Sequence, residues 1–168
     1  MSVLYGASVW QEKANPSNYR YDTLVKDSEV IAVGDPLTLS SGVLSVTTGT
    51  TTIIGVSGRA LTAAQVGATN DTVYCPYVPV SDDTIFLMGT DSDLTDNETD
   101  GGTYYTLTAT GTGLIQVAVA HGVATTTSRV VEIVKVDPRG IGGSGSGSGL
   151  REVLVRFIKT PYTNSVTT

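Results

Sequence analysis

Residues 30–60 read VIAVGDPLTLSSGVLSVTTGTTTIIGVSGRA, and this stretch decides the class of fold. Short apolar runs alternate there with turn-forming residues: residues 34–36 are Gly-Asp-Pro, and residues 41–42 are Ser-Gly. Leu37 and Leu39 occupy alternate positions, as expected of a strand that buries one face. We therefore expect three short strands with a tight reversal at residues 41–42, and we find no side chain in the stretch that is suited to catalysis.

The composition of the whole chain favours many short strands over helices. The chain has 168 residues, of which 40% are hydrophobic, enough for the core of one domain. Nineteen glycines and six prolines supply turns, while Val and Thr suit pleated surfaces. The clearest helix signal is the capping box at residues 62–65, and we expect Gly67 to end this helix after about one turn. These features predict an all-β protein, a small sandwich or partly open barrel with at most one short helix.

The chain divides by composition into three parts. Residues 1–29 lack apolar periodicity, and we expect them to form an extended N-terminal arm. Residues 30–160 are expected to form the β domain, either as one unit or as two sub-units, 30–100 and 101–160. Residues 161–168 are polar, and we expect a loose tail.

Aromatic residues are spread through the predicted arm. Trp10, Tyr19 and Tyr21 stand there among polar residues and Pro16. Such side chains either dock on the protein's own body or provide binding energy at an interface with another subunit. Trp10, Tyr19 and Tyr21 are therefore the candidate partner-binding residues.

The second half of the chain carries further strand signals. Residues 85–88 are a compact apolar run that we expect to be a buried strand. Residues 103–120 read as a hairpin around a Gly-Thr-Gly turn, and residues 129–136 with 150–159 read as a second hairpin. The alternation predicts these side chains for the buried faces of the hairpins: Ile115, Val117, Val119, Val153, Val155 and Phe157.

The net charge of −6 argues against a nucleic-acid partner, because phosphate backbones are bound by clusters of Lys and Arg. Seven of the sixteen carboxylates lie in residues 82–100, and six of the ten basic residues lie in residues 129–159. This polarity either orients the protein on a charged partner or marks two solvated surfaces. The sequence shows no signal peptide and no apolar segment of membrane-spanning length, so we expect no membrane partner.

Residues that could carry chemistry are few. The single cysteine, Cys75, excludes an internal disulfide framework, and its apolar surroundings predict a buried, inert thiol. Pro76 and Pro79 place the strand around it at a sheet edge or in a bulge. The single histidine, His121, stands at a strand end without a nucleophile elbow, and one His with one Cys cannot form a zinc site. We expect no enzyme activity, no catalytic residue, no metal and no cofactor.

Two loops have compositions that raise the question of a ligand. Residues 91–100 are acidic, and oxygen ligands at alternate positions suit Ca²⁺. An EF-hand loop beginning at Asp96 would need a glutamate where this chain has Leu107, so a solvated loop is favoured over a calcium site of another kind. Residues 142–149 consist of Gly and Ser, lack the phosphate-binding patterns and read as a flexible connector.

Several pieces of the sequence together resemble a family of viral proteins. These pieces are VGDPLTLSSGVL at residues 33–44, a Thr-rich stretch, IGVSGRA at residues 54–60, and TVYCPY at residues 72–77. Their layout resembles that of the small head decoration, or cement, proteins of tailed bacteriophages, and the resemblance covers residues 30–80. Residues 100–160 depart from the smallest members of that family.

The resemblance implies a non-enzymatic function in the virion, on the outer surface of an icosahedral capsid. Members of the family are made in the host cytoplasm, bind the expanded capsid, commonly as homotrimers, and clamp neighbouring major capsid proteins. The implied partners are the major capsid protein and other copies of this chain, with the arm adding a strand to a capsid sheet. The alternatives are another virion component, such as a head-fibre base or tail protein, a carbohydrate-binding or adhesion module, and a hydrolase.

Overall fold

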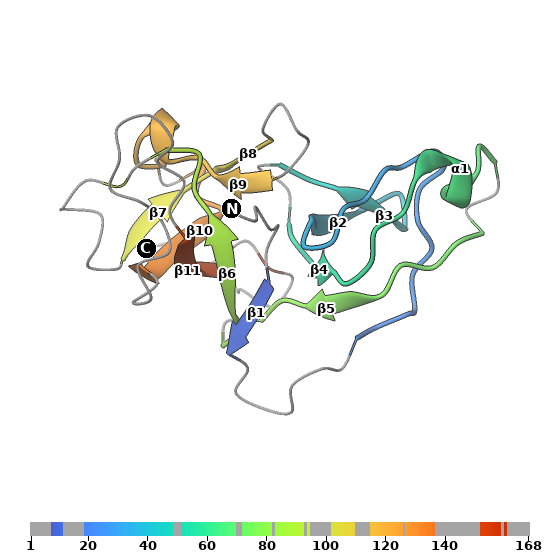
Figure 1. Ribbon diagram of the computed structural model, residues 1–168, viewed down its shortest axis with the longest axis horizontal. Coiled ribbons are helices and arrows are strands. Elements are labelled where there is room, and N and C mark those ends of the chain that lie inside the picture. Colours follow the sequence, from blue (N-terminus) through green and yellow to red (C-terminus); the bar gives the residue numbers. More distant parts are fainter. Residues whose placement is uncertain are drawn as a thin grey trace, which may run out of the picture.

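The strands form two lobes that lie side by side along the longest axis of the molecule (Figure 1). A computed structural model describes residues 8–11, 19–48, 52–69, 72–81, 83–92, 94, 102–109, 115–125, 127–136, 152–158 and 160. Lobe A contains β1 (Ser8–Gln11), β6 (Ile85–Gly89), β7 (Thr103–Tyr105), β8 (Leu107–Ala109), β9 (Ile115–Val117), the 3-10 helix η2 (Val119–His121), β10 (Val131–Val136) and β11 (Glu152–Phe157). Lobe B contains β2 (Pro36–Ser40), β3 (Val43–Val46), β4 (Gly55–Ser57), α1 (Ala63–Val66) and β5 (Tyr77–Pro79). The all-β prediction with at most one short α-helix is confirmed.

The sheet of lobe B has the order β3-β2-β4-β5, and each neighbouring pair is antiparallel. In the hairpin of β2 and β3, Ser40 is opposite Val43, so Ser41 and Gly42 alone make the turn. Their φ angles are 54° and 87°, as a tight two-residue hairpin turn requires. The predicted reversal is therefore confirmed, and β5, which includes Pro79, lies at the edge of the sheet as expected.

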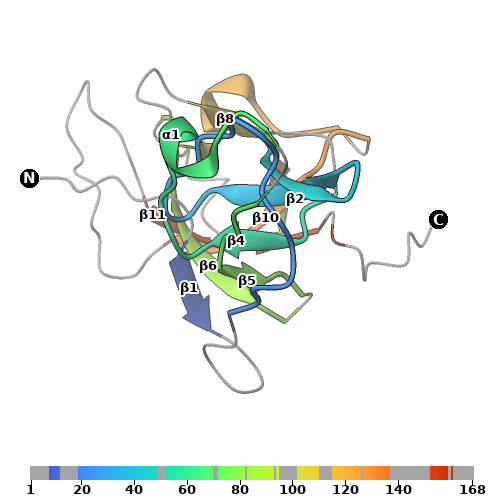
Figure 2. The ribbon, with the colours of Figure 1, turned by 90° about the vertical axis from the view of Figure 1, so that its right-hand side faces the viewer.

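Residues 19–26, here named the strap, pair with β5 and the residues before it (Figure 2). Arg20 is opposite Tyr77 in antiparallel orientation, and Leu24 is opposite Tyr74. The Arg20 N–H donates to the Tyr77 carbonyl at 2.8 Å, and the Tyr77 N–H donates to the Arg20 carbonyl at 3.1 Å. The strap thus acts as an additional short strand along this edge of the sheet.

The strap also pairs with β3, at the opposite edge of the same sheet. Val25 forms a parallel bridge with Leu44 of β3. The Leu44 N–H donates to the Leu24 carbonyl at 2.7 Å, and the Lys26 N–H donates to the Leu44 carbonyl at 2.9 Å. Because β3 and β5 are the two edges of the sheet, the strap closes the sheet on itself, with the Val25 side chain buried inside.

The helix α1 begins where the capping box predicts. The Gln65 N–H donates to Thr62 Oγ1 at 3.3 Å, and the Thr62 N–H donates to Gln65 Oε1 at 2.9 Å. Gly67, with a φ of 87°, follows the last helical residue, so the predicted helix is confirmed at both ends. No helix within the described residues is both long enough and apolar enough to cross a membrane.

The sheet of lobe A has the order β1-β6-β11-β10-β7. After Thr106 the chain continues from β7 into β8, which pairs with β9, and Val117 of β9 bridges to Thr90 directly after β6. In the order β6, β11, β10, β7, β8 and β9, these strands therefore form most of a closed barrel. The β10–β11 pair confirms the second predicted hairpin, and the β8–β9 pair confirms the first in part. Residues 103–105, expected in the first strand of that hairpin, form β7 and pair with β10.

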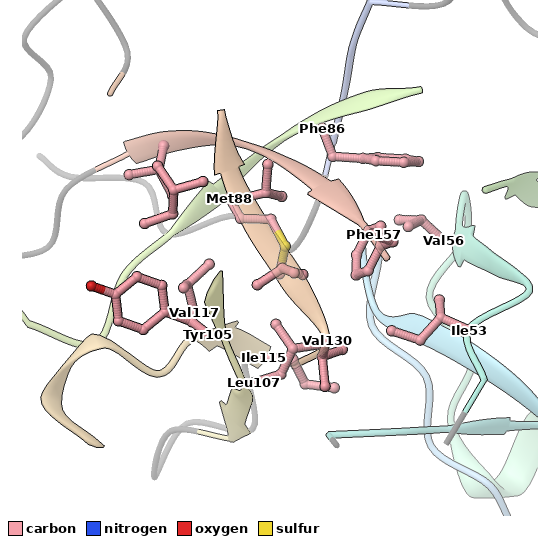
Figure 3. Close-up of a cluster of buried hydrophobic side chains, with 14 of the residues drawn as sticks. Ile53, Val56, Phe86, Met88, Tyr105, Leu107, Ile115, Val117, Val130 and Phe157 are labelled. Atoms are coloured by element: carbon pink, nitrogen blue, oxygen red, sulfur yellow. The ribbon is translucent and has the colours of Figure 1, made fainter. Parts of the chain in front are cut away.

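Two clusters of buried side chains fill the lobes, and β4 with β5 forms the wall between the clusters. Val56 of β4 and Val78 of β5 belong to the cluster that contains Phe157 of lobe A (Figure 3). On the opposite face of the same strands, the ring of Tyr77 packs against Gly55 inside lobe B. Both faces of this wall are therefore buried, one in each core.

The burial of the lobe A strands follows the two-residue period of a strand, with one exception. Residues 85–88 lie in a strand, β6, as expected, but only one face of it is fully buried: Phe86 and Met88 face the core, whereas Ile85 and Leu87 are partly exposed. Gln116 is the exception, because it alternates with core residues and is still fully buried. The side chains predicted for the buried hairpin faces are all buried: Ile115, Val117, Val119, Val153, Val155 and Phe157.

Candidate functional site

Tyr19, Tyr21 and Tyr74 are large apolar side chains that lobe B exposes to solvent. Their exposed fractions are 45%, 62% and 50%. Tyr19 and Tyr21 belong to the strap, and Tyr74 lies on the segment that the strap pairs with. We name these three side chains the tyrosine face.

The ladder between the strap and β5 explains why the three tyrosines point outward. Opposed residues of an antiparallel pair point to the same side, and successive residues alternate. Arg20 is opposite Tyr77, whose side chain enters the core of lobe B, so Tyr19 and Tyr21 point to the outer side. Tyr74 points outward by the same alternation, because the next residue, Cys75, is buried in that core.

The tyrosine face continues the surface of lobe B that packs on lobe A. Along the strand, Tyr74 and Val78 share the outer side by alternation. Val78 is buried in the core shared with lobe A, whereas Tyr74 is exposed. The face therefore begins where the cover of lobe A ends.

Specific contacts hold the strap in position. A Cβ placed on Gly58 would lie 2.2 Å from Cε1 of Tyr19, so the Tyr19 ring rests directly on this backbone. The Tyr77 hydroxyl donates to Asp22 Oδ1 at 2.9 Å. This hydrogen bond is the largest cause that lowers the pKa of Asp22, and burial is the largest cause that raises the pKa of Tyr77. The tyrosines are thus presented on a fixed strand.

Charged residues lie close to the tyrosine face. Arg20 and Asp22 are exposed on the strap, but they alternate with Tyr19 and Tyr21 and therefore point to the side of Tyr77, to which Asp22 is bonded. Arg59, also exposed, follows the Gly58 that supports Tyr19. Exposed aromatic side chains are the residue type that contributes most to protein-binding surfaces, so the face suits a protein partner.

The structure brings two of the three sequence-predicted residues together and places the third elsewhere. Tyr19 and Tyr21 lie on one side of the strap, whereas Trp10 lies in β1 at the edge of lobe A. The pairing of β1 with β6 skips Trp10, which is the extra residue between Val9 and Gln11. Both described parts of residues 1–29 pair with the protein's own body, and a role of these aromatics in partner binding stays a prediction.

Sequence reasoning missed Tyr74. Its signal is the alternation in Val73-Tyr74-Cys75, because a buried Cys75 places Tyr74 on the opposite side of an edge strand. The Cys75 thiol is buried as expected, contacts Ser57 Oγ at 3.5 Å, and has a pKa that burial raises.

Asp35, in the Gly-Asp-Pro turn, is a buried carboxyl group that sequence reasoning treated only as a turn former. Its Oδ2 accepts a hydrogen bond from the Ala32 N–H at 2.7 Å, and its Oδ1 has no hydrogen-bond partner. Burial, the largest cause, raises the pKa of Asp35 to about 6, and the charge of Glu29 adds to the shift. Burial, the largest cause, raises the pKa of the Cys75 thiol, and the charge of Asp35 reaches this thiol and raises its pKa further. This thiol is therefore not activated as a nucleophile, and we assign a structural role to the Asp35 carboxyl group.

The remaining sequence-based expectations concern residues at the margins of the described set. His121 ends the short helix η2, and its side chain lies outside the described set. Residues 142–149, residues 161–168 and most of residues 91–100 also lie outside it. Among the residues that the structure does describe, no three His, Cys, Asp or Glu side chains are grouped so that they could hold a metal ion.

Comparison with known proteins adds no relative. No family model, no curated protein and no solved structure matches this chain.

Proposed function

We propose that this chain is a non-enzymatic virion protein that binds the outer surface of an icosahedral phage capsid. In this proposal it stabilises the capsid by clamping neighbouring major capsid proteins. The tyrosine face is the observation that carries the proposal, because it offers fixed, exposed aromatic side chains to a protein partner. Lobe B, which presents the face, also contains the residues that resemble the head decoration proteins of tailed phages.

The stabilisation would follow from binding to one state of the lattice. A ligand that binds only the expanded capsid lowers the free energy of that state relative to the unexpanded one, by an amount set by its affinity and concentration. Exposed tyrosines suit this role because they add buried area and hydrogen bonds at little cost in side-chain entropy. Several copies around one symmetry axis, such as a homotrimer, would add their effects.

The test is co-sedimentation of the purified protein with expanded capsids of the virus that encodes it. The triple variant Tyr19→Ala, Tyr21→Ala and Tyr74→Ala should bind at least 30-fold more weakly, since a buried interface tyrosine contributes about 2 kcal/mol or more. The matched control replaces Leu39 and Val123, which are exposed by 49% and 58% and lie outside the face.

The control variant should bind as the unchanged protein does. Equal binding by all three proteins would remove the tyrosine face from the mechanism. No binding by the unchanged protein would contradict the decoration function itself. Quantitative mass spectrometry of virions separates decoration from a head-fibre or tail role, because a decoration protein should be present in numbers near those of the major capsid protein.

A carbohydrate-binding module is a second candidate, supported by the same observation. The flat faces of exposed tyrosines also stack on sugar rings, and the strap holds Tyr19 and Tyr21 two residues apart on one side. Pull-down of the protein with cellulose, chitin and bacterial peptidoglycan tests this candidate. Retention that the triple tyrosine variant loses, together with no binding to capsids, would replace the first proposal.

A further inference from the structure

The strap is attached to lobe B mainly through backbone hydrogen bonds, and a second copy of this chain offers the same donors and acceptors. Its pairing with β5 and β3 uses backbone hydrogen bonds on both sides, from Arg20 to Lys26. Its buried side chain is Val25, and the Asp22 carboxylate adds the bond from the Tyr77 hydroxyl. The strap of a second copy could therefore make every one of these contacts in the same place.

A tight turn joins the strap to the rest of lobe B. The turn is closed by the Glu29 N–H, which donates to the Lys26 carbonyl at 3.1 Å. Glu29 already belongs to the body of the lobe, because its Oε1 accepts hydrogen bonds from the Val46 N–H at 2.9 Å and from Ser45 Oγ at 3.1 Å. On the C-terminal side of the strap, the connection to the fixed body is therefore only two residues long. On its N-terminal side the chain leads to β1, which pairs with β6 of lobe A, so β1 has to move together with the strap.

Ser28 gives this turn a strained conformation. Its φ is 58°, in the left-handed region that residues with a side chain seldom adopt. Its side chain is exposed, and its N–H donates to the Gly67 carbonyl at 2.8 Å. The turn keeps this conformation as long as the strap folds back on its own lobe. A short strained hinge of this kind favours exchange of the attached element between copies.

We propose that the strap exchanges between copies of this chain together with β1. Residues 19–26 of one copy then close the lobe B sheet of another, and residues 8–11 pair with β6 of that other copy. In the exchanged form the turn at residues 26–29 opens into an extended connection, and Ser28 leaves the left-handed region. The strap contacts are the same in both forms, so concentration and the hinge decide between them. The inference goes beyond the proposed function, because it concerns self-association and needs no capsid.

A cysteine pair reports directly which copy supplies the strap. Leu24 and Tyr74 are opposite each other across the ladder. The neighbouring bond from the Val25 N–H to the Val73 carbonyl makes them a non-hydrogen-bonded pair, whose Cα atoms are about 4.5 Å apart, close enough for a disulfide. The reporter is Leu24→Cys with Tyr74→Cys, in a Cys75→Ser background that removes the native thiol.

Two substitutions of Ser28 shift the hinge in opposite directions without changing any buried contact. Ser28→Val places a β-branched residue at positive φ and should disfavour the closed turn. Ser28→Gly removes the strain and should favour it. Both variants keep the backbone N–H that bonds to Gly67. Each reporter protein is unfolded in urea, refolded at low and at high protein concentration, oxidised with glutathione, and separated on a non-reducing denaturing gel.

The proposal expects disulfide-linked dimers or trimers after refolding at high concentration. Relative to Ser28, the linked fraction should rise about fivefold or more with Ser28→Val and fall about fivefold or more with Ser28→Gly. Disulfides within single chains only, at every concentration and with all three hinges, would overturn it. So would a linked fraction that the hinge does not change. If Ser28→Val does not refold, the comparison of Ser28 with Ser28→Gly decides the question.

Discussion

Replacing Asp35 with Asn should change how the stability of the protein depends on pH. The Asp35 side chain is only 3% exposed, with one oxygen bonded to the Ala32 N–H and the other without a partner. Its pKa is raised from 3.8 to about 6, first because burial disfavours the charged form and then because Glu29 is near. The folded protein therefore binds the proton of Asp35 more tightly than the unfolded chain does.

The sign and size of the effect follow from this difference in proton binding. A raised carboxyl pKa adds stability below about pH 4, and this contribution is lost as the pH rises through 6. The shift corresponds to about 3 kcal/mol between pH 4 and pH 8. Asn cannot titrate, but its amide N–H₂ group lacks an acceptor, which costs about 1 kcal/mol. We expect Asp35→Asn to be about 1 kcal/mol less stable than the unchanged protein at pH 4 and about 2 kcal/mol more stable at pH 8.

Urea unfolding at whole pH units from 4 to 8, followed by circular dichroism, measures this difference. Asp22→Asn is the control: the pKa of Asp22 is lowered, so its contribution is lost only below pH 4, and the free-energy difference should stay constant from pH 4 to pH 8. A free-energy difference for Asp35→Asn that stays constant across the pH range would refute the reasoning. It would mean that water reaches Asp35 in solution.

Three further substitutions test the packing described above. Gln116→Met should raise the free energy of unfolding by about 1–2 kcal/mol, measured by urea unfolding, because both amide atoms are buried without a partner; destabilisation would show that a water bonds to the amide. Gly55→Ala should cost at least about 2 kcal/mol in the same assay, because the new Cβ would lie 2.2 Å from the Tyr77 ring and 2.8 Å from the Val78 carbonyl oxygen. Tyr77→Phe should cost about 0.5–1 kcal/mol at pH 7 and less at pH 2, since its hydroxyl bonds to the exposed Asp22 carboxylate, which acid protonates; an equal loss at both pH values would contradict this account.

The features that local sequence chemistry controls could be predicted. The Ser41-Gly42 hairpin turn needs two residues that tolerate positive φ, and those two residues are adjacent in the sequence. The α1 helix needs a capping pair three residues apart, which is equally visible. Val153, Val155 and Phe157 recur at every second position, which defined one buried face of β11 in the same way. On the other face, Glu152 and Arg156 are partly exposed, whereas Leu154 is buried as well.

The features that depend on pairing between distant residues could not be predicted. The strap pairs with residues fifty or more positions away, Tyr74 and Tyr77, and no local pattern marks these partners. The tyrosine face was therefore seen only in part, because Tyr74 joins it through this pairing. The burial of Gln116 has the same origin, since a neighbouring strand, at Gly89, contacts it.

The strap also limits how an arm can be removed experimentally. A deletion that extends to residue 22 would remove Arg20 and Asp22 and would open the sheet of lobe B. β1 pairs with β6 of lobe A in the same way, so a truncation that leaves all of these pairings intact has to end before Ser8.

The wall of β4 and β5 makes the two lobes inseparable as modules. Val56 and Val78 face one core, while Gly55 and Tyr77 face the other. Separating the lobes would therefore expose to solvent side chains that are buried in the whole protein. Lobe B expressed by itself would expose an apolar strand surface, and lobe A would lose a side of its core. We therefore expect recombination or fusion at the lobe boundary to expose apolar surface on both halves and to favour aggregation.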